Sequence, residues 1–142
     1  MSMRSNALLP VLALATLLTS HATEARADLL TACASEISRY CADVSKGRGR
    51  ISACLMGHMG RLGSACRPEV QTVMKSRQTP SYVRKALSPG FRAPLPEACA
   101  APAARFCPGM TQGGVFACLY ARSDRIPKAC FNAAQATLKQ AK

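Results

Sequence analysis

The sequence predicts an all-α protein built from two disulfide-stapled helical hairpins joined by a proline-rich linker. Three observations predict this class. Apolar residues recur at helical spacing on either side of short polar turns, eight cysteines fall into two sets of four with nearly equal spacing, and the segment between the sets is rich in proline. A chain of 142 residues with 5% aromatic residues buries a small core. Cross-links commonly stabilise cores of that size.

Residues 1–27 are predicted to be a secretory signal peptide. An apolar run at 7–18 is followed by Ala25-Arg26-Ala27, whose small residues suit cleavage before Asp28. The run is shorter than the roughly 20 residues that a membrane-spanning helix needs. Residues 30–33, Leu-Thr-Ala-Cys, look like a lipoprotein acylation motif, but charged residues separate them from the apolar run. We therefore expect an exported protein, periplasmic or secreted, with no transmembrane segment after signal removal.

The cysteines indicate an internal duplication. Their separations are 8, 13 and 12 residues in the first set and 8, 11 and 12 in the second. Flanking residues match as well, since Arg39-Tyr40-Cys41 corresponds to Arg105-Phe106-Cys107. We divide the chain into a signal peptide (1–27), a first cysteine-rich repeat (28–77), a linker (78–96) and a second repeat (97–142).

The first repeat is predicted to form two helices and a short third one. Apolar residues keep helical spacing across residues 29–41 and again across residues 51–66. The polar segment 43–49 between them contains two glycines and suits a turn. A further short helix is predicted over residues 68–76, because proline is well tolerated in the first turn of a helix.

The second repeat is predicted to follow the same order. Pro108-Gly109 opens its turn and Gly113-Gly114 closes it. Pro102 indicates that the first helix of this repeat starts near that residue or is kinked there. The prolines between residues 78 and 96 are expected to stop regular structure and to act as a hinge.

Helix geometry favours one pairing of the cysteines. Eight residues of helix separate the first two cysteines of a set by about 12 Å, which is beyond the reach of a disulfide. In an antiparallel hairpin the inner cysteines flank the turn and the outer ones close the open end. The two helices differ in cysteine spacing by about 6 Å, so they must cross at an angle or fray near Cys66. Crossed pairing within a repeat remains an alternative. The favoured pairs are Cys33–Cys66, Cys41–Cys54, Cys99–Cys130 and Cys107–Cys118.

The first repeat resembles a known family. Cys41-Ala42-Asp43-Val44, the run Gly47-Arg48-Gly49-Arg50-Ile51 and Cys54-Leu55 are similar to the cysteine-rich repeat of Golgi apparatus protein 1, also called cysteine-rich fibroblast growth factor receptor. The chain also looks similar to short exported bacterial proteins that carry one or two copies of this repeat. The second repeat departs from the pattern, with Gly109-Met110 in place of the Asp-Val pair. The resemblance implies a helical, disulfide-bonded, exported module and implies no reaction.

Catalytic patterns are missing from the sequence. It contains neither Gly-x-Ser-x-Gly nor His-Glu-x-x-His, and no two cysteines are spaced by two residues as in thiol oxidoreductases. A single histidine, His58, follows the signal peptide. We therefore expect a non-enzymatic binding or structural module without a cofactor.

Positive charge is the main functional indication. The formal net charge is +12, and such a field attracts anionic polymers or proteins. Export disfavours nucleic acid as a dedicated partner, and the oligomeric state is left open. For any one basic cluster the alternative is a solvated face that keeps the protein soluble. A further cluster is formed by Arg122, Arg125 and Lys128. The residues expected to contact anionic envelope or extracellular material are Lys46, Arg48, Arg50, Arg84 and Lys85.

A periplasmic metal-binding or thiol redox-buffering protein is the alternative function. Cys54, Met56, His58 and Met59 lie close together in the sequence and offer ligands that suit copper. The corresponding positions of the second repeat hold no ligand other than the cysteine. We therefore predict no metal site, and we expect all eight cysteines to form structural disulfides.

Overall fold

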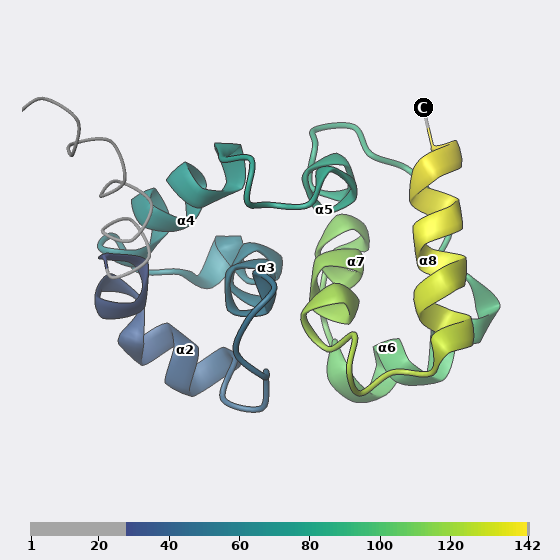
Figure 1. Cartoon of the computed structure of the whole chain (residues 1–142), viewed down its shortest axis with the longest axis horizontal. Helices are drawn as coiled ribbons and strands as arrows, with labels where there is room; N and C mark the ends of the chain where they lie inside the picture. Colours follow the sequence, from purple (N-terminus) through teal and green to yellow (C-terminus); the bar gives the residue numbers. More distant parts are fainter. Residues whose placement is uncertain (1–27, 142) are drawn as a thin grey trace, which may run out of the picture.

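Helices form all the regular secondary structure in residues 28–141, the part of the chain that the computed structural model describes (Figure 1). The predicted all-α class is confirmed. The predicted signal peptide lies outside the described residues. Within them, no helix is long and apolar enough to cross a membrane. After a helical segment at 28–32, the elements are α2 (Ala34–Tyr40), α3 (Arg50–Gly57), η1 (Met59–Arg61), α4 (Cys66–Lys75), α5 (Ser81–Ala86), η2 (Glu97–Cys99), α6 (Ala100–Phe106), α7 (Gln112–Ala121) and α8 (Lys128–Gln140).

The two long helices predicted for the first half are each interrupted. Cys33 lies in a turn between residues 28–32 and α2. The helix predicted across 51–66 ends at Gly57, and an extended residue, Leu62, precedes α4. Three glycines between residues 57 and 63 explain the break, because glycine is a poor helix former. The predicted short helix is confirmed as α4, with Pro68 in its first turn.

The four disulfides are the nested pairs that the hairpin geometry favours. The outer pairs, Cys33–Cys66 and Cys99–Cys130, have Cα–Cα distances of 4.6 and 4.7 Å. The inner pairs, Cys41–Cys54 and Cys107–Cys118, have distances of 6.1 and 6.0 Å. The predicted mismatch in cysteine spacing is resolved by the breaks after α3 and α7, which place Cys66 and Cys130 in the first turn of a new helix, α4 or α8. The two halves therefore share one cross-linked plan.

The second half corrects one prediction and supports another. Gly113 and Gly114 lie inside α7 and do not close the preceding turn. Packing explains their place, because a Cβ at Gly113 would overlap the carbonyl oxygen of Ala86. Pro102 is the third residue of α6, so the helix starts near it as predicted.

The predicted linker is partly structured, which corrects the expectation of a hinge. Pro80 precedes α5, and Val83 and Ala86 of this helix are buried. Phe91 and Ala93, further along the segment, are buried in the core of the second half. The prolines interrupt regular structure in this segment, but the six residues of α5 contain none. They form a helix that packs on α7 and α8.

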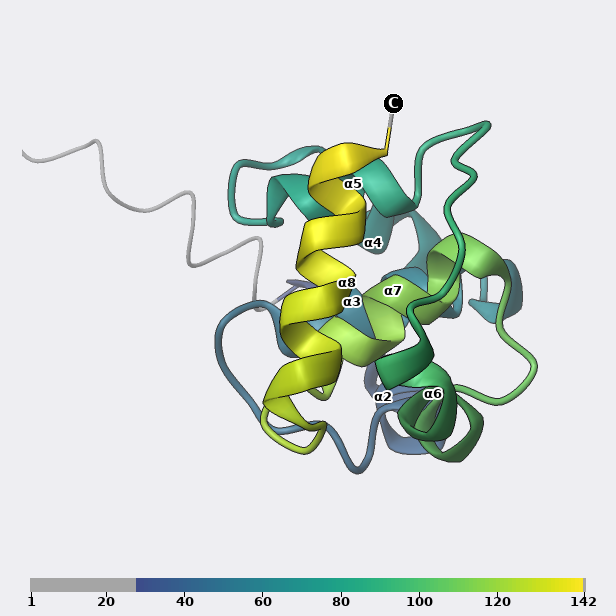
Figure 2. The ribbon, with the colours of Figure 1, turned by 90° about the vertical axis from the view of Figure 1, so that its right-hand side faces the viewer.

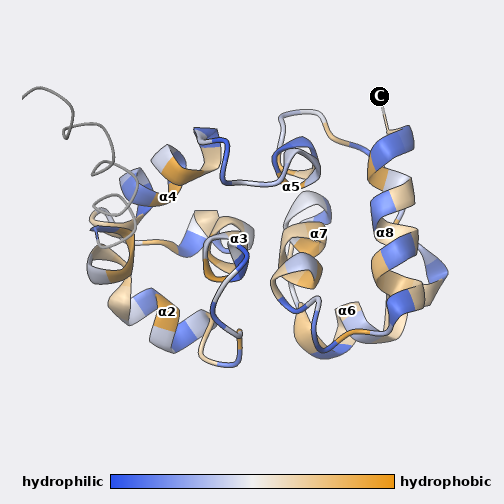
Figure 3. Cartoon of the chain, in the orientation of Figure 1, coloured by the Kyte–Doolittle hydropathy of each residue, from blue (hydrophilic) through white to orange (hydrophobic). Residues whose placement is uncertain are grey.

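Helices α3 and α7 lie side by side at the centre and join the two halves (Figures 1 and 2). Their contact is made by small residues, since Gly57 faces Gly114 and Ala117 and Ala121 of α7 belong to the core of the first half. Hydrophobic residues are prominent on α3 and α7, whereas α2 and α8 carry many hydrophilic ones (Figure 3). The hairpins thus pack against each other.

Candidate ligand site

The first candidate site is built on the turn between Cys41 and α3. Three consecutive residues, Gly47, Arg48 and Gly49, have positive φ angles of 95°, 52° and 70°. Glycine adopts this region readily, whereas Arg48 does so only because its surroundings hold it there. Its carbonyl accepts a hydrogen bond of 2.7 Å from the hydroxyl of Tyr120 on α7. The second half therefore fixes the shape of this turn.

The side chain of Arg50 stabilises the turn by hydrogen bonding to its backbone carbonyls. Its Nε donates to the carbonyl of Ser45 at 3.1 Å, and its Nη2 donates to the carbonyl of Lys46 at 2.8 Å. Its Nη1 lies 3.4 Å from Oδ2 of Asp124 in the second half. The hydroxyl of Ser45 also donates to that carboxylate, and this hydrogen bond is the main reason why the pKa of Asp124 is lowered.

A cavity of about 190 Å³ opens beside this turn. Its apolar wall comes from the helical segment 28–32, α2, α3 and α4. Leu30 stands out on this wall because it is 52% exposed, although large aliphatic side chains gain free energy from burial. Polar groups of the turn and Gln78 complete the lining. The lining residues are Leu29, Leu30, Ile37, Lys46, Gly47, Gly49, Arg50, Ile51, Ser52, Val73 and Gln78.

The structure separates the five cations that the sequence groups together. Lys46 and Arg50 line the cavity, and Arg48 lies exposed between them in the sequence. Arg84 does not line the cavity and donates to the carbonyl of Ser76 at 2.8 Å. Lys85 is half-buried on α5 and likewise does not line it. Arg50 is already paired with Asp124, so Lys46 is the lining cation without an ion pair in the described residues.

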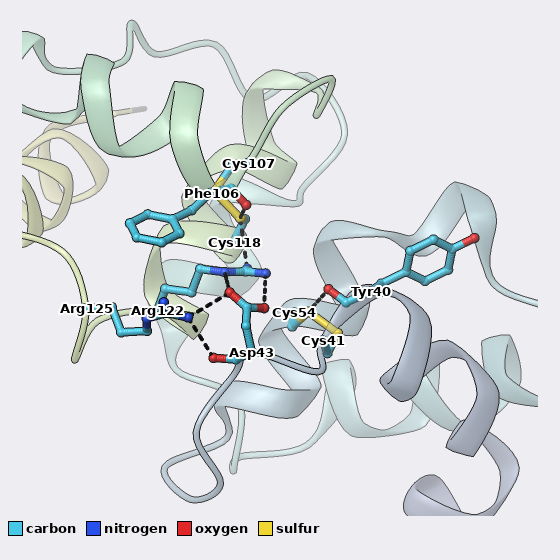
Figure 4. Close-up of a disulfide and its surroundings, with 9 residues drawn as sticks. All are labelled: Tyr40, Cys41, Asp43, Cys54, Phe106, Cys107, Cys118, Arg122 and Arg125. Atoms are coloured by element: carbon cyan, nitrogen blue, oxygen red, sulfur yellow. Dashed lines mark hydrogen bonds and ion pairs between the residues drawn. A yellow bond between two sulfur atoms is a disulfide. The ribbon is translucent and has the colours of Figure 1, made fainter.

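Two further cations predicted to attract anions form ion pairs within the protein. Arg122 is 5% exposed and forms two parallel hydrogen bonds with the carboxylate of Asp43, at 3.0 and 2.8 Å (Figure 4). Arg125 donates to the same carboxylate at 3.0 Å and to the backbone carbonyl of Asp43 at 3.1 Å. Hydrogen bonds from Arg122 are the largest cause of the lowered pKa of Asp43. These contacts tie the first turn to the end of α7.

The residues considered for copper do not form a thiolate site. The sulfur of Cys54 is bonded to Cys41, Met56 is buried, and His58 stacks on the ring of Tyr40 at 4.7 Å. All eight cysteines lie in disulfides. Across residues 28–141, no three His, Cys, Asp or Glu side chains are placed to hold a metal ion together.

Sequence reasoning missed two features of this region. Leu29 and Ile37 are recognisable as the apolar face of one predicted helix and Ile51 as part of that of the next, but nothing in their spacing shows that the two faces line a cavity. The pairing of Asp43 with Arg122, 79 residues away, carries no local signal. The corresponding turn of the second half has Gly109 in place of this aspartate. That difference between the repeats is the sequence signal that comes closest to indicating the pairing.

The comparisons with known proteins agree with the resemblance seen in the sequence. A family model described as a cysteine-rich repeat, of the type named for the cysteine-rich fibroblast growth factor receptor, matches residues 23–63. This range includes Cys33, Cys41 and Cys54, together with the turn that borders the cavity. No curated protein and no solved structure gives a significant match to the chain.

Proposed function

We propose that the chain, which contains a cysteine-rich repeat of this family within residues 23–63, is an exported, non-enzymatic binding module. Its first half binds a ligand that combines a short apolar chain with one anionic group. Such ligands belong to the anionic envelope or extracellular material expected from the charge of the chain. A cysteine-rich, disulfide-bonded domain fits a binding or structural module, and the cavity favours binding.

One observation carries the proposal, namely that the cavity joins an apolar wall to a cation that has no ion pair within residues 28–141. Ligand pockets are mostly apolar with a few polar groups that fix orientation. Here Leu30, Ile51 and Val73 supply the apolar wall, and Lys46, an exposed residue of the lining, supplies the positive charge. An apolar chain gains free energy by burial against the wall, while the ammonium selects an anionic head group.

Export is supported by the sulfur chemistry. Disulfides persist in oxidising compartments, and every cysteine of this chain is paired. Because no thiol is free in the structure, the redox-buffering alternative has no group to act with unless a disulfide is first reduced. N-terminal sequencing of the protein purified from its native compartment tests export: we expect a chain that starts at Asp28, and retention of residues 1–27 would contradict it.

Calorimetric titration with three eight-carbon ligands tests the binding proposal. Octanoate, octanol and octylammonium present the same chain with a negative, neutral or positive head. We expect octanoate to bind most tightly and its binding to weaken with added salt, since exposed charges are screened. Equal binding of the three ligands would contradict the role of Lys46.

Matched variants localise the site. Lys46→Gln should weaken octanoate about two- to fivefold, the effect of losing one exposed ion pair, while Lys75→Gln, which alters a lysine outside the cavity, should have no effect. Ser52→Leu places apolar volume in the cavity and should abolish binding without unfolding the protein. Unchanged octanoate binding by Ser52→Leu would place the ligand elsewhere.

A further inference from the structure

The two halves contain the same backbone turn after their central helices. The amide of Arg61 donates to the carbonyl of His58 at 2.8 Å after α3. After α7, the amide of Arg125 donates to the carbonyl of Arg122, also at 2.8 Å. Counting from the inner cysteines Cys54 and Cys118, His58 corresponds to Arg122 and Arg61 to Arg125.

An aromatic ring lies beside each of these turns. Tyr40 stacks on His58, with ring centroids 4.7 Å apart. In the other half, the guanidinium of Arg125 lies over the ring of Phe106, 5.2 Å from its centroid. The carbonyls of Tyr40 and Phe106 contact the inner disulfides at almost the same distances, 3.5 and 3.4 Å from the sulfur. Each turn therefore has an aromatic ring and an inner disulfide beside it, with Tyr40 against His58 in one half and Phe106 against Arg125 in the other.

Only one of the two turns has a carboxylate. Asp43 of the first half reaches across to Arg122 and Arg125 (Figure 4). Its counterpart in the second half is Gly109, because Asp43 follows Cys41 at the same spacing as Gly109 follows Cys107. Just as Asp43 of the first half contacts Arg125 of the second, Gly109 of the second half lies close to Arg61 of the first. A Cβ added to Gly109 would be 3.9 Å from Arg61 Nη2. No other described atom beyond its chain neighbours lies within 4 Å of that Cβ position.

The cation at this second position has no acidic partner among the described residues. Arg61 is exposed and forms no ion pair or side-chain hydrogen bond with the described residues. Glu36 accepts hydrogen bonds from the amide of Gly63 and the hydroxyl of Ser35 and forms no ion pair with Arg61. Burial lowers the pKa of His58, and the positive charges of Arg61 and Arg122 lower it further.

We propose that Arg61, His58 and the Gly109 turn form a second binding site, for a carboxylate supplied from outside the chain. The carboxylate takes the position that Asp43 occupies in the other half and pairs with Arg61. Both a free small carboxylate and an acidic side chain of another protein have this chemistry. None of the three residues lines the cavity, so this proposal and the octanoate proposal can fail independently.

The ring signals of His58, followed by NMR in the full chain, test this site. A nearby anion favours the charged imidazolium and counteracts the field of Arg61 and Arg122. Saturating acetate should therefore raise the pKa of His58. The acetate-dependent rise should disappear in Arg61→Ala and persist in Arg77→Ala, a matched change of an exposed arginine elsewhere. An equal rise in both variants would overturn the proposal.

A carboxylate built into the turn gives a second test. Gly109→Asp should raise the pKa of His58 by about one unit and abolish its response to acetate. Gly90→Asp is the control, because Gly90 also has positive φ, 82° against 68°, and lies in open space. Identical His58 pKa values in the two variants would overturn the site.

A titration with a glutamate-rich peptide distinguishes the two sources of the carboxylate. If the peptide saturates the His58 response at a lower carboxylate concentration than acetate does, the source is an acidic protein. If the two concentrations are equal, the source is a free carboxylate.

Discussion

At the scale of single residues, the contact between Asp43 and Arg122 is the most consequential. Arg122 is almost fully buried, and its guanidinium is satisfied by Asp43 and by the sulfur of Cys118 at 3.2 Å. A buried charge that loses its partner is costly, because it cannot recover the hydration it gave up on folding. Asp43 is 43% exposed, which moderates the cost.

Replacing Asp43 should therefore destabilise the fold. Asp43→Ala removes the carboxylate that accepts hydrogen bonds from Arg122 and Arg125, and we expect a loss of about 1.5 to 3 kcal/mol in the free energy of unfolding. Urea denaturation measures this loss. Glu97→Ala, a matched change of an exposed acid without a partner in the described residues, should cost much less. Equal costs would contradict the importance of the pair.

The same pair predicts how stability depends on pH. The pKa of Asp43 is lowered in the folded protein, so its contribution is present above the unfolded-state pKa of about 3.9. It is lost as the pH falls through the lower folded-state pKa. The difference in stability between wild type and Asp43→Asn should therefore shrink between about pH 6 and pH 2. A difference that stays constant over this range would show that the charge of Asp43 is unimportant.

At the scale of elements, glycines decide where helices end and how closely they approach. Gly57 and Gly114 allow α3 and α7 to pack, since a Cβ at either would lie 3.1 Å from the other's carbonyl oxygen. Gly113 similarly admits the backbone of α5. The sequence shows these glycines, but their role depends on a neighbouring helix, so Gly113-Gly114 is read from sequence as a turn.

Alanine substitutions test this packing. Gly113→Ala should destabilise the protein by about 1 to 3 kcal/mol through overpacking, even though alanine favours helix by about 1 kcal/mol. Gly60→Ala is the control, because a Cβ at Gly60 meets nothing within 4 Å. Thermal unfolding compares the two variants. A stabilised Gly113→Ala would contradict the close approach of α5 and α7.

At the scale of the whole molecule, the sequence predicts the class and the cross-linked plan but not the joining of the halves. Cysteine spacing and helical periodicity are local signals, and they suffice for two nested hairpins. The contact of α3 with α7 and the burial of α5 arise between segments far apart in the sequence. Of the predicted ligand residues, Lys46 lies at the cavity with no ion pair in the part of the chain that the structure describes. Arg50 is instead paired with a distant aspartate that local patterns do not reveal.

The joining of the halves predicts one cooperative transition. Ala117 and Ala121 of α7 lie in the core of the first half, and Tyr82 contacts both cores, so neither hairpin can unfold without exposing the other. Denaturation with the disulfides intact should give coincident curves for Tyr fluorescence and helical circular dichroism. Two separate transitions would show hairpins that swing on an independent linker.

The central claim is that the first half binds an anionic amphiphile between its apolar wall and Lys46, and a crystal structure of the full chain with octanoate tests it most directly. We expect the carbon chain against Leu30, Ile51 and Val73, with the carboxylate within about 4 Å of the Lys46 ammonium. An empty cavity at saturating octanoate, or a ligand bound with its carboxylate away from Lys46, would contradict the claim.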